Sequence, residues 1–469
     1  MIPIKGAKGK AVAVMGLGRS GLCTAQALLE SGADVRAWDD NADRRTTAEA
    51  EGIPIVALTN GVWSDIDALV LSPGIPHTHP EAHPIATLAR ANGVEIIGDI
   101  ELLKRSATEA TFIGITGTNG KSTTTALIGH ILESAKRPAQ TGGNLGRPVL
   151  DFDLIGTEGV YVLELSSFQL DLTPSAGFDI AVLLNITPDH LDRHGGMDGY
   201  IAAKRHIFED CTGTAIIGID DPACAAICTE LQQSGKASVL PLSVTGPVEG
   251  GVYLDNGVLI DDIDGNRVKV TRVDDIITLP GSHNAQNAAA AYAAARAVGL
   301  SIESIISGIR SYPGLAHRQQ LIALIDGVRY VNDSKATNPE AAARALSCYP
   351  DIYWIAGGRA KEGGLDSLTP YLSHIRHAFL IGEAAEPFAS SLGDRIETEI
   401  SETLETATRD AHALIQKEAQ DEAVLLLSPA CASYDQYPSF EVRGDDFMRC
   451  VKALPGNDRK FFATAEVGS

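Results

Sequence analysis

Short apolar runs alternate with amphipathic or alanine-rich stretches along almost the whole chain. This alternation is typical of α/β domains with mostly parallel sheets. The first cycle has an apolar run at 11–15, a glycine-rich turn at 16–21, an amphipathic stretch that Gly32 can end, and a second apolar run at 35–38. Strand, glycine-rich turn, helix and strand in this order predict a nucleotide-binding βαβ unit.

A second domain begins near residue 98, where a predicted helix at 99–105 leads into a strand at 112–115 and a second glycine-rich loop. Between residues 250 and 275 the pattern changes, because Asn-Gly and Asp-Gly pairs separate β-prone runs. Such pairs predict antiparallel hairpins. Two further strands of this domain are predicted at 160–165 and 180–184.

A third α/β domain follows an alanine-rich helix at 284–298 and the segment "SYPGLAHRQQ", which we interpret as a hinge. A length of 469 residues fits three domains, because one hydrophobic core rarely serves so long a chain. We predict a Rossmann-like N-terminal domain at 1–99, a central P-loop-type ATPase α/β domain with a small antiparallel insertion at 100–314, and a Rossmann-like C-terminal domain at 315–469. Strands of the third domain are predicted at 352–356, 378–381 and 423–427.

The excess of acidic over basic residues argues against two classes of binding partner. Lys and Arg number 38 against 60 Asp and Glu, a formal net charge of −22, which opposes binding to nucleic acid or to an anionic membrane surface. The sequence has no apolar run as long as a membrane-spanning helix, and glycines interrupt its apolar start too early for a signal peptide. The seven cysteines are scattered, and we interpret Cys224 and Cys228 as helix packing rather than metal ligands. We expect reduced thiols in a cytoplasmic protein.

The loop "GITGTNGKSTTTAL" at 114–127 is a candidate phosphate site, although its glycines lack the usual GxxxxGK[ST] spacing. A glycine-rich turn before a helix offers backbone N–H groups to phosphate, Lys121 adds a mobile positive charge, and the Ser122 hydroxyl is a ligand for Mg²⁺. The alternative is an ordinary turn with an exposed lysine.

Three more polar residues accompany the strands and helices of this domain. Glu164 ends an apolar run, where a carboxylate is costly to bury unless it is paired or bound to a cation such as Mg²⁺. His190 follows another predicted strand and by itself fits a capping or core histidine. Lys204 lies in a predicted helix among small and apolar residues and, taken alone, is interpreted as a surface lysine.

Two motifs of the first domain have competing interpretations. "GLGRSG" at 16–21, with Asp39 about eighteen residues further on, is near the spacing of an NAD fingerprint and suggests an NAD-dependent oxidoreductase. That hypothesis gives no task to Lys121 or Glu164. "HTHPEAH" at 77–83 suggests zinc, but three histidines in a proline-containing loop lack a supporting set of ligands.

The motifs taken together resemble a known family. "GTNGKS", "GGNLG", "ELSSFQL", "NITPDHLDRH", "YIAAK", "HNAQN", "HR" at 317–318 and "NDSKATNP" occur in the order found in the Mur ligases, ATP-dependent amino-acid-adding enzymes of peptidoglycan precursor synthesis. "SPACASYDQYPSFEVRG", "GLGRSG" and "SPGIP" further resemble the branch that adds D-glutamate to UDP-N-acetylmuramoyl-L-alanine. A sibling ligase or a folylpolyglutamate synthetase shares the central motifs but not "SPACASYDQ". A non-catalytic nucleotide-binding regulator would not need so complete a site.

The resemblance implies a mechanism and its cofactors. ATP phosphorylates a substrate carboxylate, and an amine attacks the resulting acyl phosphate. The catalytic residues implied are Lys121, Glu164, His190 and Lys204. Two Mg²⁺ ions, which Mn²⁺ can replace, would be held by Ser122, Glu164, His190 and Lys204, the last as a carbamate formed with CO₂. The ATP-binding residues implied are Gly117, Thr118, Asn119, Gly120, Lys121, Ser122, Thr123, Asn284, Asn287, Arg318, Asp333 and Lys335.

The resemblance also implies where the small-molecule substrates bind, and it implies a monomer. Helix capping is the alternative for Asn284 and Asn287, and ordinary core packing is the alternative for the aromatic residues. Because Arg318 and Asp333 lie beyond the hinge, we expect the chemistry to require domain closure. The UDP-substrate residues implied are Leu17, Gly18, Arg19, Ser20, Asp39, Gly74 and Asn144, and the D-glutamate residues are Thr337, Lys361, Ser433, Tyr434 and Phe440.

Overall fold

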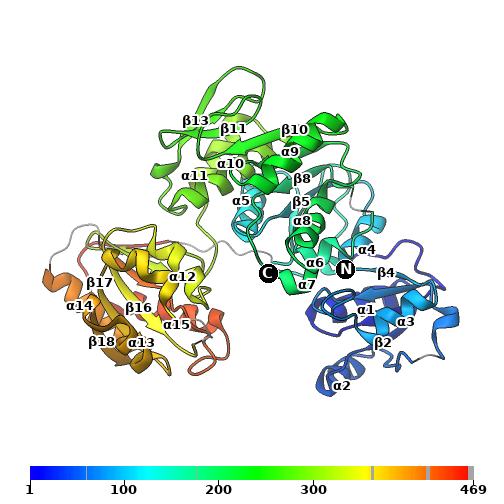
Figure 1. Cartoon of the computed structure of the whole chain (residues 1–469), viewed down its shortest axis with the longest axis horizontal. Helices are drawn as coiled ribbons and strands as arrows, with labels where there is room; N and C mark the ends of the chain where they lie inside the picture. Colours follow the sequence, from blue (N-terminus) through cyan, green and yellow to red (C-terminus); the bar gives the residue numbers. More distant parts are fainter. Residues whose placement is uncertain (60, 176, 361–363, 419–422, 463–469) are drawn as a thin grey trace. The chain divides into compact units, whose positions relative to one another are not determined.

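The computed structural model describes every residue except 60, 176, 361–363, 419–422 and 463–469. The chain divides into two compact units. The first, Met1–Val273 with Ser282–Arg310, holds an N-terminal and a central α/β domain, and the second, Asp274–Gly281 with Ser311–Glu466, holds a C-terminal α/β domain (Figure 1). Within the described ranges, none of the helices combines the length and the apolar character that crossing a membrane requires.

A parallel sheet with the strand order β2-β1-β3-β4 forms the N-terminal domain. Because side chains alternate across a strand, Val12 and Val14 share a core with helices α1 and α4, whereas Ala13 and Met15 share one with α3. The elements are β1 (Ala11–Met15), α1 (Arg19–Glu30), β2 (Asp34–Trp38), α2 (Ala42–Ala50), η1 (Trp63–Asp65), β3 (Ala68–Leu71), α3 (Pro84–Ala91), β4 (Glu95–Ile97) and α4 (Asp99–Ser106).

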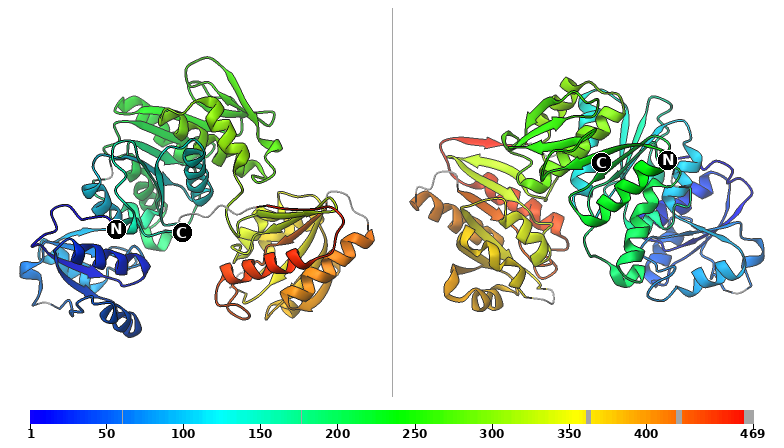
Figure 2. Two further views of the ribbon diagram at one scale, coloured as in Figure 1. Left: turned by 180° about the vertical axis from the view of Figure 1, so that it is seen from behind. Right: turned by 45° about the horizontal axis from the view of Figure 1, so that its top comes forward.

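The central domain has the strand order β13-β12-β11-β10-β9-β8-β5-β7-β6. Strands β5 to β10 are parallel, and β11, β12 and β13 form the antiparallel hairpins predicted for residues 250–275, seen in green in Figure 2. Its strands are β5 (Thr111–Thr116), β6 (Ala139–Gly143), β7 (Val160–Glu164), β8 (Ile180–Leu183), β9 (Thr214–Gly218), β10 (Ser238–Ser243), β11 (Val252–Asp255), β12 (Val258–Asp261) and β13 (Val268–Arg272). Its helices are α5 (Lys121–Ser134), η2 (Val149–Asp151), α6 (Ser167–Leu170), α7 (Leu191–His194), α8 (Met197–Arg205), η3 (His206–Phe208), α9 (Pro222–Ser234), η4 (Val273–Asp275), α10 (Ser282–Ala297) and α11 (Ile302–Ser311).

The N-terminal and central domains are joined by backbone and core contacts. The Gly98 N–H donates to the carbonyl of Leu172 at 2.7 Å, and the Ile2 N–H donates to the carbonyl of Leu150 at 2.8 Å. A continuous hydrophobic core extends from β1 and α1 to β7, β8 and α9. In α9, Cys224 and Cys228 are buried in that core, as the packing interpretation predicts.

The C-terminal domain has the strand order β18-β17-β16-β19-β15-β14-β20. Helices α12 and α13 contribute to the core on one face of this sheet, and α14 and α15 to the core on the other (Figure 1). Strands β14, β15 and β20, which pair antiparallel, were not predicted. Its elements are β14 (Gln320–Ile325), β15 (Val328–Asn332), α12 (Pro339–Leu346), β16 (Ile352–Gly357), η5 (Asp366–His374), β17 (Ile375–Ile381), α13 (Ala385–Leu392), η6 (Gly393–Arg395), β18 (Glu397–Glu402), α14 (Leu404–Glu418), β19 (Val424–Leu427), α15 (Phe440–Ala453) and β20 (Arg459–Phe461).

Candidate active site

The glycine-rich loop lies between β5 and α5, as its sequence predicts. Gly120 has φ of +84°, and a Cβ added there would lie 2.1 Å from Oδ1 of Asn287. Asn287 in turn donates to Oδ1 of Asn284 at 2.9 Å. Asn287, predicted with Asn284 to bind ATP, therefore lies at the loop, and only glycine fits beside it. Ser122 and Thr123 follow in the first turn of α5, where Ser122 is buried.

Asn185, which sequence reasoning did not single out, fixes the backbone of the same loop. Its Oδ1 accepts from the Asn119 N–H at 2.9 Å, and its carbonyl accepts from the Thr118 N–H at 2.9 Å. Its Nδ2 donates to Gln286 of α10 at 2.8 Å. The sequence does contain a signal for Asn185. An amide side chain directly after a buried strand lies at the edge where such sheets place their ligand sites.

Lys204 is buried, with 1% of its surface exposed, so the surface interpretation is wrong. Its Nζ donates to the carbonyl oxygen of Gly117 at 2.8 Å, and Nζ of Lys121 donates to the same oxygen at 2.8 Å. Burial, followed by the neighbouring charge of Lys121, lowers the pKa of Lys204 to about 7. The amine also lies 4.7 Å from the ring centroid of Tyr200.

Glu164 ends β7 and is 3% exposed. Its Oε1 accepts from Nδ2 of Asn144 at 2.9 Å, whereas its Oε2 is buried without a hydrogen-bond partner among the described residues. A buried carboxylate oxygen left in this way is costly, and a hard divalent cation such as Mg²⁺ would satisfy it. Asn144, predicted as a substrate contact, is thus a neighbour of the predicted metal ligand.

His190 follows the loop after β8 in a left-handed conformation, with φ of +51°. Its side chain is 54% exposed, and its ring centroid lies 5.2 Å from that of Phe168. Phe168 also contacts the guanidinium of Arg193, which lies 4.5 Å from the ring centroid, and the ring of His194, which is stacked at 5.2 Å. These contacts fix the segment that carries His190 against the start of α6.

The residues present fit Mg²⁺. In the part of the chain that the structure describes, His, Cys, Asp and Glu side chains form no cluster of three or more around a common centre. Mg²⁺ keeps water or substrate phosphate oxygens as ligands and needs few protein ligands. The buried, unpartnered Oε2 of Glu164 is one protein oxygen that suits such an ion.

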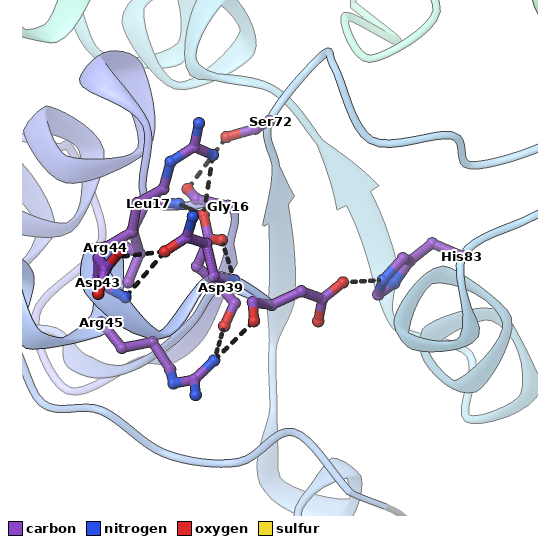
Figure 3. Close-up of polar contacts among 10 residues, drawn as sticks. Gly16, Leu17, Asp39, Asp43, Arg44, Arg45, Ser72 and His83 are labelled. Atoms are coloured by element: carbon purple, nitrogen blue, oxygen red, sulfur yellow. Dashed lines mark hydrogen bonds and ion pairs between the residues drawn. The ribbon is translucent and has the colours of Figure 1, made fainter.

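The N-terminal domain has its own candidate site at the "GLGRSG" turn (Figure 3). A Cβ at Gly16 would lie 2.6 Å from Ser72, and one at Gly21 would lie 1.8 Å from the Gly16 carbonyl, whereas one at Gly18 would meet nothing within 4 Å. The outer glycines are thus required for packing, and the middle glycine leaves open space for a ligand. Of the other predicted residues in this turn, Arg19 is exposed, Ser20 is partly buried and the Leu17 side chain is buried.

Asp39 organises the turn. Its Oδ2 accepts from the Leu17 N–H at 2.7 Å, and its Oδ1 accepts from the Asn41 N–H at 2.8 Å (Figure 3). Burial raises the pKa of Asp39, but the hydrogen bonds from Leu17 and Asn41 and the charge of Arg44 outweigh it, so the pKa is lowered overall. Asp39 is therefore a charged acceptor at the end of β2.

The histidines of loop 72–83 do not converge on a metal. His83 donates through Nε2 to Asp40 at 2.9 Å, because its Nδ1 accepts from a backbone N–H (Figure 3). His77 lies against Arg90, and His79 packs against Gly195. Their separate partners argue against zinc.

Loop 72–83 also contacts the segment that carries His190. Arg193 donates through a terminal nitrogen to the carbonyl of Gly74 at 3.2 Å. His77 lies 4.0 Å from Asp171, whose carboxylate is also 3.5 Å from Nδ1 of the buried His194. Gly74, predicted to bind substrate, is thus one hydrogen bond away from the predicted catalytic segment.

In the C-terminal domain, Asp333 and Arg318 lie in neighbouring loops. Asp333 is 7% exposed and accepts from the Ser428 hydroxyl at 2.7 Å and the Gln319 N–H at 3.1 Å. Burial raises the pKa of Asp333 to about 7, although these hydrogen bonds and the Arg318 charge lower it in part. Arg318 is exposed.

Phe440, one of the predicted amino-acid residues of this domain, begins α15. Nζ of Lys335 lies 3.9 Å from the ring centroid of Phe440. Ser433 is 2% exposed, Thr337 is partly buried, and Tyr434 is 68% exposed. Lys361 lies outside the described residues.

Three family models cover most of the chain. They are the Mur ligase MurD-like N-terminal domain at 10–98, the Mur ligase middle domain at 115–295 and the Mur ligase glutamate ligase domain at 317–431. The chain belongs to the Mur ligase family. The predicted family and the predicted three-part α/β fold are confirmed, and the chain is a ligase.

The sequence of this Mur ligase is similar to those of two named relatives over almost its full length. A protein of Caulobacter vibrioides named UDP-N-acetylmuramoylalanine--D-glutamate ligase is 51% identical over 468 residues, covering 98% of this chain and 99% of the relative. A protein of the same name from Rhodospirillum rubrum is 50% identical over 462 residues, covering 97% of each.

Solved structures share the fold of this Mur ligase at low identity. The UDP-N-acetylmuramate-alanine ligase MurC of Thermotoga maritima has a TM-score of 0.56 at 18% identity and covers 95% of this chain and 99% of its own. MurF of Acinetobacter baumannii has a TM-score of 0.56 at 20% identity and covers 96% of this chain and 93% of its own. Mur ligases use ATP and Mg²⁺, which agrees with the loop at 117–123 and the Glu164 carboxylate.

Proposed function

We propose that this Mur ligase adds D-glutamate to UDP-N-acetylmuramoyl-L-alanine. The observation that carries the proposal is the identity of 50% and 51%, over 97% and 98% of the chain, to relatives named for that activity. We further propose that it acts as a monomer and that it is located in the cytoplasm. The cytoplasmic location agrees with its seven free cysteines, because thiols stay reduced there.

The proposed reaction has two covalent steps. A carboxylate oxygen of the acceptor attacks the γ-phosphorus of ATP, and ADP leaves. The amine of D-glutamate then attacks the acyl carbon of the acyl phosphate, and inorganic phosphate leaves as the amine loses a proton. Phosphorylation is needed because a carboxylate oxygen is a poor leaving group.

Residues of the central domain support the first step. The loop N–H groups at 117–123 and the Lys121 ammonium would bind the phosphates, because they place positive charge at a helix N-terminus. Glu164, Ser122 and His190 would hold Mg²⁺ or Mn²⁺. Bound there, the metal neutralises the charge of two anions that would otherwise repel each other.

Lys204 is proposed to carry a carbamate. Its neutral amine would attack CO₂ and lose a proton, leaving a carboxylate on the nitrogen. A pKa of about 7, caused by burial and then by Lys121, supports this step, because only the neutral amine is nucleophilic. The lysine would then provide a negative charge for the metal site.

The remaining assignments are proposals of the same kind. Leu17, Gly18, Arg19, Ser20, Asp39, Gly74 and Asn144 would bind the UDP substrate. Asn284, Asn287, Arg318, Asp333 and Lys335 would complete the nucleotide site. Thr337, Lys361, Ser433, Tyr434 and Phe440 would bind D-glutamate.

The test is phosphate release from ATP in the presence of UDP-N-acetylmuramoyl-L-alanine. D-Glutamate, L-glutamate, L-alanine and L-lysine are compared, with product formation measured in parallel. We expect turnover with D-glutamate alone. A preference for another amino acid would overturn the substrate assignment, and coupling without ATP consumption would overturn the mechanism.

A further inference from the structure

Arg443 is a buried arginine that has no role in the predicted site or in the proposed reaction. It lies in the first turns of α15 and is 1% exposed. Its Nε donates to the Ser334 hydroxyl at 3.0 Å. One terminal nitrogen donates to the Ser334 carbonyl at 2.9 Å and to the Cys431 carbonyl at 3.1 Å.

Within the described ranges no carboxylate contacts the guanidinium directly, although the charge of Asp435 is close enough to raise the pKa of Arg443 in part. The guanidinium forms no ion pair there, and its other terminal nitrogen, NH1, is buried without a hydrogen bond. Burial lowers the pKa of Arg443 to about 10, so the group still carries its charge at neutral pH. Burying an unpaired cation is expensive, and stability alone would favour an apolar residue in its place.

The contacts of Arg443 link the chain segments that carry the proposed amino-acid pocket. Ser334, bonded twice, begins the segment that leads to Thr337, and its hydroxyl also donates to the Phe440 carbonyl at 2.8 Å. Cys431 lies two residues before Ser433. One side chain therefore holds together backbone from after β15, from after β19 and from the start of α15.

The segment after β16 also approaches the guanidinium. Gly358 follows β16 with φ of +128°, and a Cβ there would lie 2.3 Å from the Ala432 carbonyl and 3.2 Å from NH1 of Arg443. Glycine is thus required where the chain after β16 passes the guanidinium. The guanidinium lies between the segments that follow β15, β16 and β19, at the edge where parallel sheets of this kind place their ligand sites.

We propose that Arg443 is a positioning residue for the amino-acid substrate, holding the segments after β15 and β19 and the start of α15 in the geometry that binds a dicarboxylic amino acid. The proposal rests on the proposed function. Arg443 acts through the residues it holds, since its own nitrogens are buried.

The test compares Arg443→Lys and Arg443→Met with Arg376→Met. Arg376 is an exposed arginine of the same domain that pairs with Asp351. KM is measured separately for D-glutamate, ATP and the UDP substrate, and the thermal shift produced by D-glutamate is recorded. We expect KM for D-glutamate to rise roughly tenfold in Arg443→Lys and further in Arg443→Met, with the other two KM values within about twofold. Arg376→Met should leave all three unchanged.

Ser334→Ala provides a second test if Arg443→Met does not fold. It removes the acceptor of Nε and the bond to Phe440, and a smaller rise in the same KM is expected. An unchanged KM for D-glutamate in the folded variants, or an equal rise in all three KM values, would overturn the positioning role. A wild-type enzyme that prefers another amino acid would refute the proposed function instead, and the comparison would then be made with that amino acid.

Discussion

Lys121 and Lys204 donate to the same carbonyl oxygen, that of Gly117, and each does so at 2.8 Å. Two positive charges that share one acceptor repel each other, and the repulsion is least screened at the buried member. Burial of Lys204, which is 1% exposed, and then the charge of Lys121 lower the pKa of Lys204 to about 7. The loop that would bind phosphate thus also adjusts the chemistry of the lysine behind it.

Lys204→Ala should lose most of the ligase activity, and Lys204→Glu should retain more, because a glutamate carboxylate can replace part of a carbamate. Incubation of the wild type with ¹³C-bicarbonate should give a carbamate signal in the NMR spectrum. Since the folded-state pKa is lowered to about 7, the amine gains its proton as pH falls through that value, and the signal should fade there. Full activity of Lys204→Ala, or the same signal from that variant, would contradict the carbamate.

Glu164→Gln should weaken metal binding without disturbing the local fold. The amide keeps an oxygen for Asn144 but replaces the unpartnered Oε2 with a group that cannot bind a cation. We expect the Mg²⁺ concentration for half-maximal activity to rise roughly tenfold or more. Glu158→Gln, which removes an exposed partner of Arg137, is the matched control. Equal Mg²⁺ requirements in the two variants would rule out Glu164 as a ligand.

Gly120→Ala should destabilise the loop and weaken ATP binding. Alanine at a φ of +84° costs about 1 kcal/mol, and its Cβ would also collide with Asn287. Gly156→Ala, at a φ of +65° with nothing within 4 Å, carries the backbone cost alone. Thermal denaturation and ATP titration should therefore show a larger loss for Gly120→Ala. The double variant with Asn287→Ala should recover part of the lost thermal stability, but not the ATP binding, because Asn287 is itself a proposed nucleotide contact. A loss of stability no larger than that of Gly156→Ala would show that the Asn287 side chain moves aside without a cost in free energy.

Asp333→Asn should change how stability depends on pH. The folded-state pKa of Asp333 is raised from its ordinary 3.8 to about 7, so the protonated form is favoured in the folded protein. This stabilisation is complete below about 4 and is lost as pH rises through about 7. Asparagine does not titrate, whereas wild type loses this stabilisation as the pH rises, so the melting temperature of Asp333→Asn relative to wild type should rise between pH 5 and pH 8. The Ser428 hydroxyl can accept from the new amide, so a hydrogen bond is kept at this position. A constant difference, or the same trend in the exposed Asp366→Asn control, would contradict the assignment.

The sequence predicts those features of this Mur ligase that depend on local pattern. The strands at 11–15 and 352–356 and the loop at 117–122 follow from apolar runs and glycines within a few residues of each other. The hairpins at 250–275 follow from Asn-Gly and Asp-Gly pairs. The hairpin of β14 and β15 carries the same signal at Asp326-Gly327 and could have been predicted.

Partners that come from distant parts of the chain could not be predicted from local pattern. Lys204 has the helical position of a surface lysine, and only the fold places it against Gly117, 87 residues away in the chain. Arg443 contacts Ser334 across 109 residues. The burial of such charged side chains depends on which distant segments pack together in the fold. The periodicity of apolar residues along the chain does not determine this packing.

The hydrogen bond from Arg193 to the Gly74 carbonyl connects loop 72–83 to the segment that carries His190. A small inhibitor lodged under loop 72–83 would have to displace that carbonyl, and Arg193 would lose its anchor beside Phe168. The disturbance would reach His190 without the compound entering the nucleotide pocket. On the proposed site assignments, compounds that bind at loop 72–83 would then disturb the segment that carries His190 without competing with ATP.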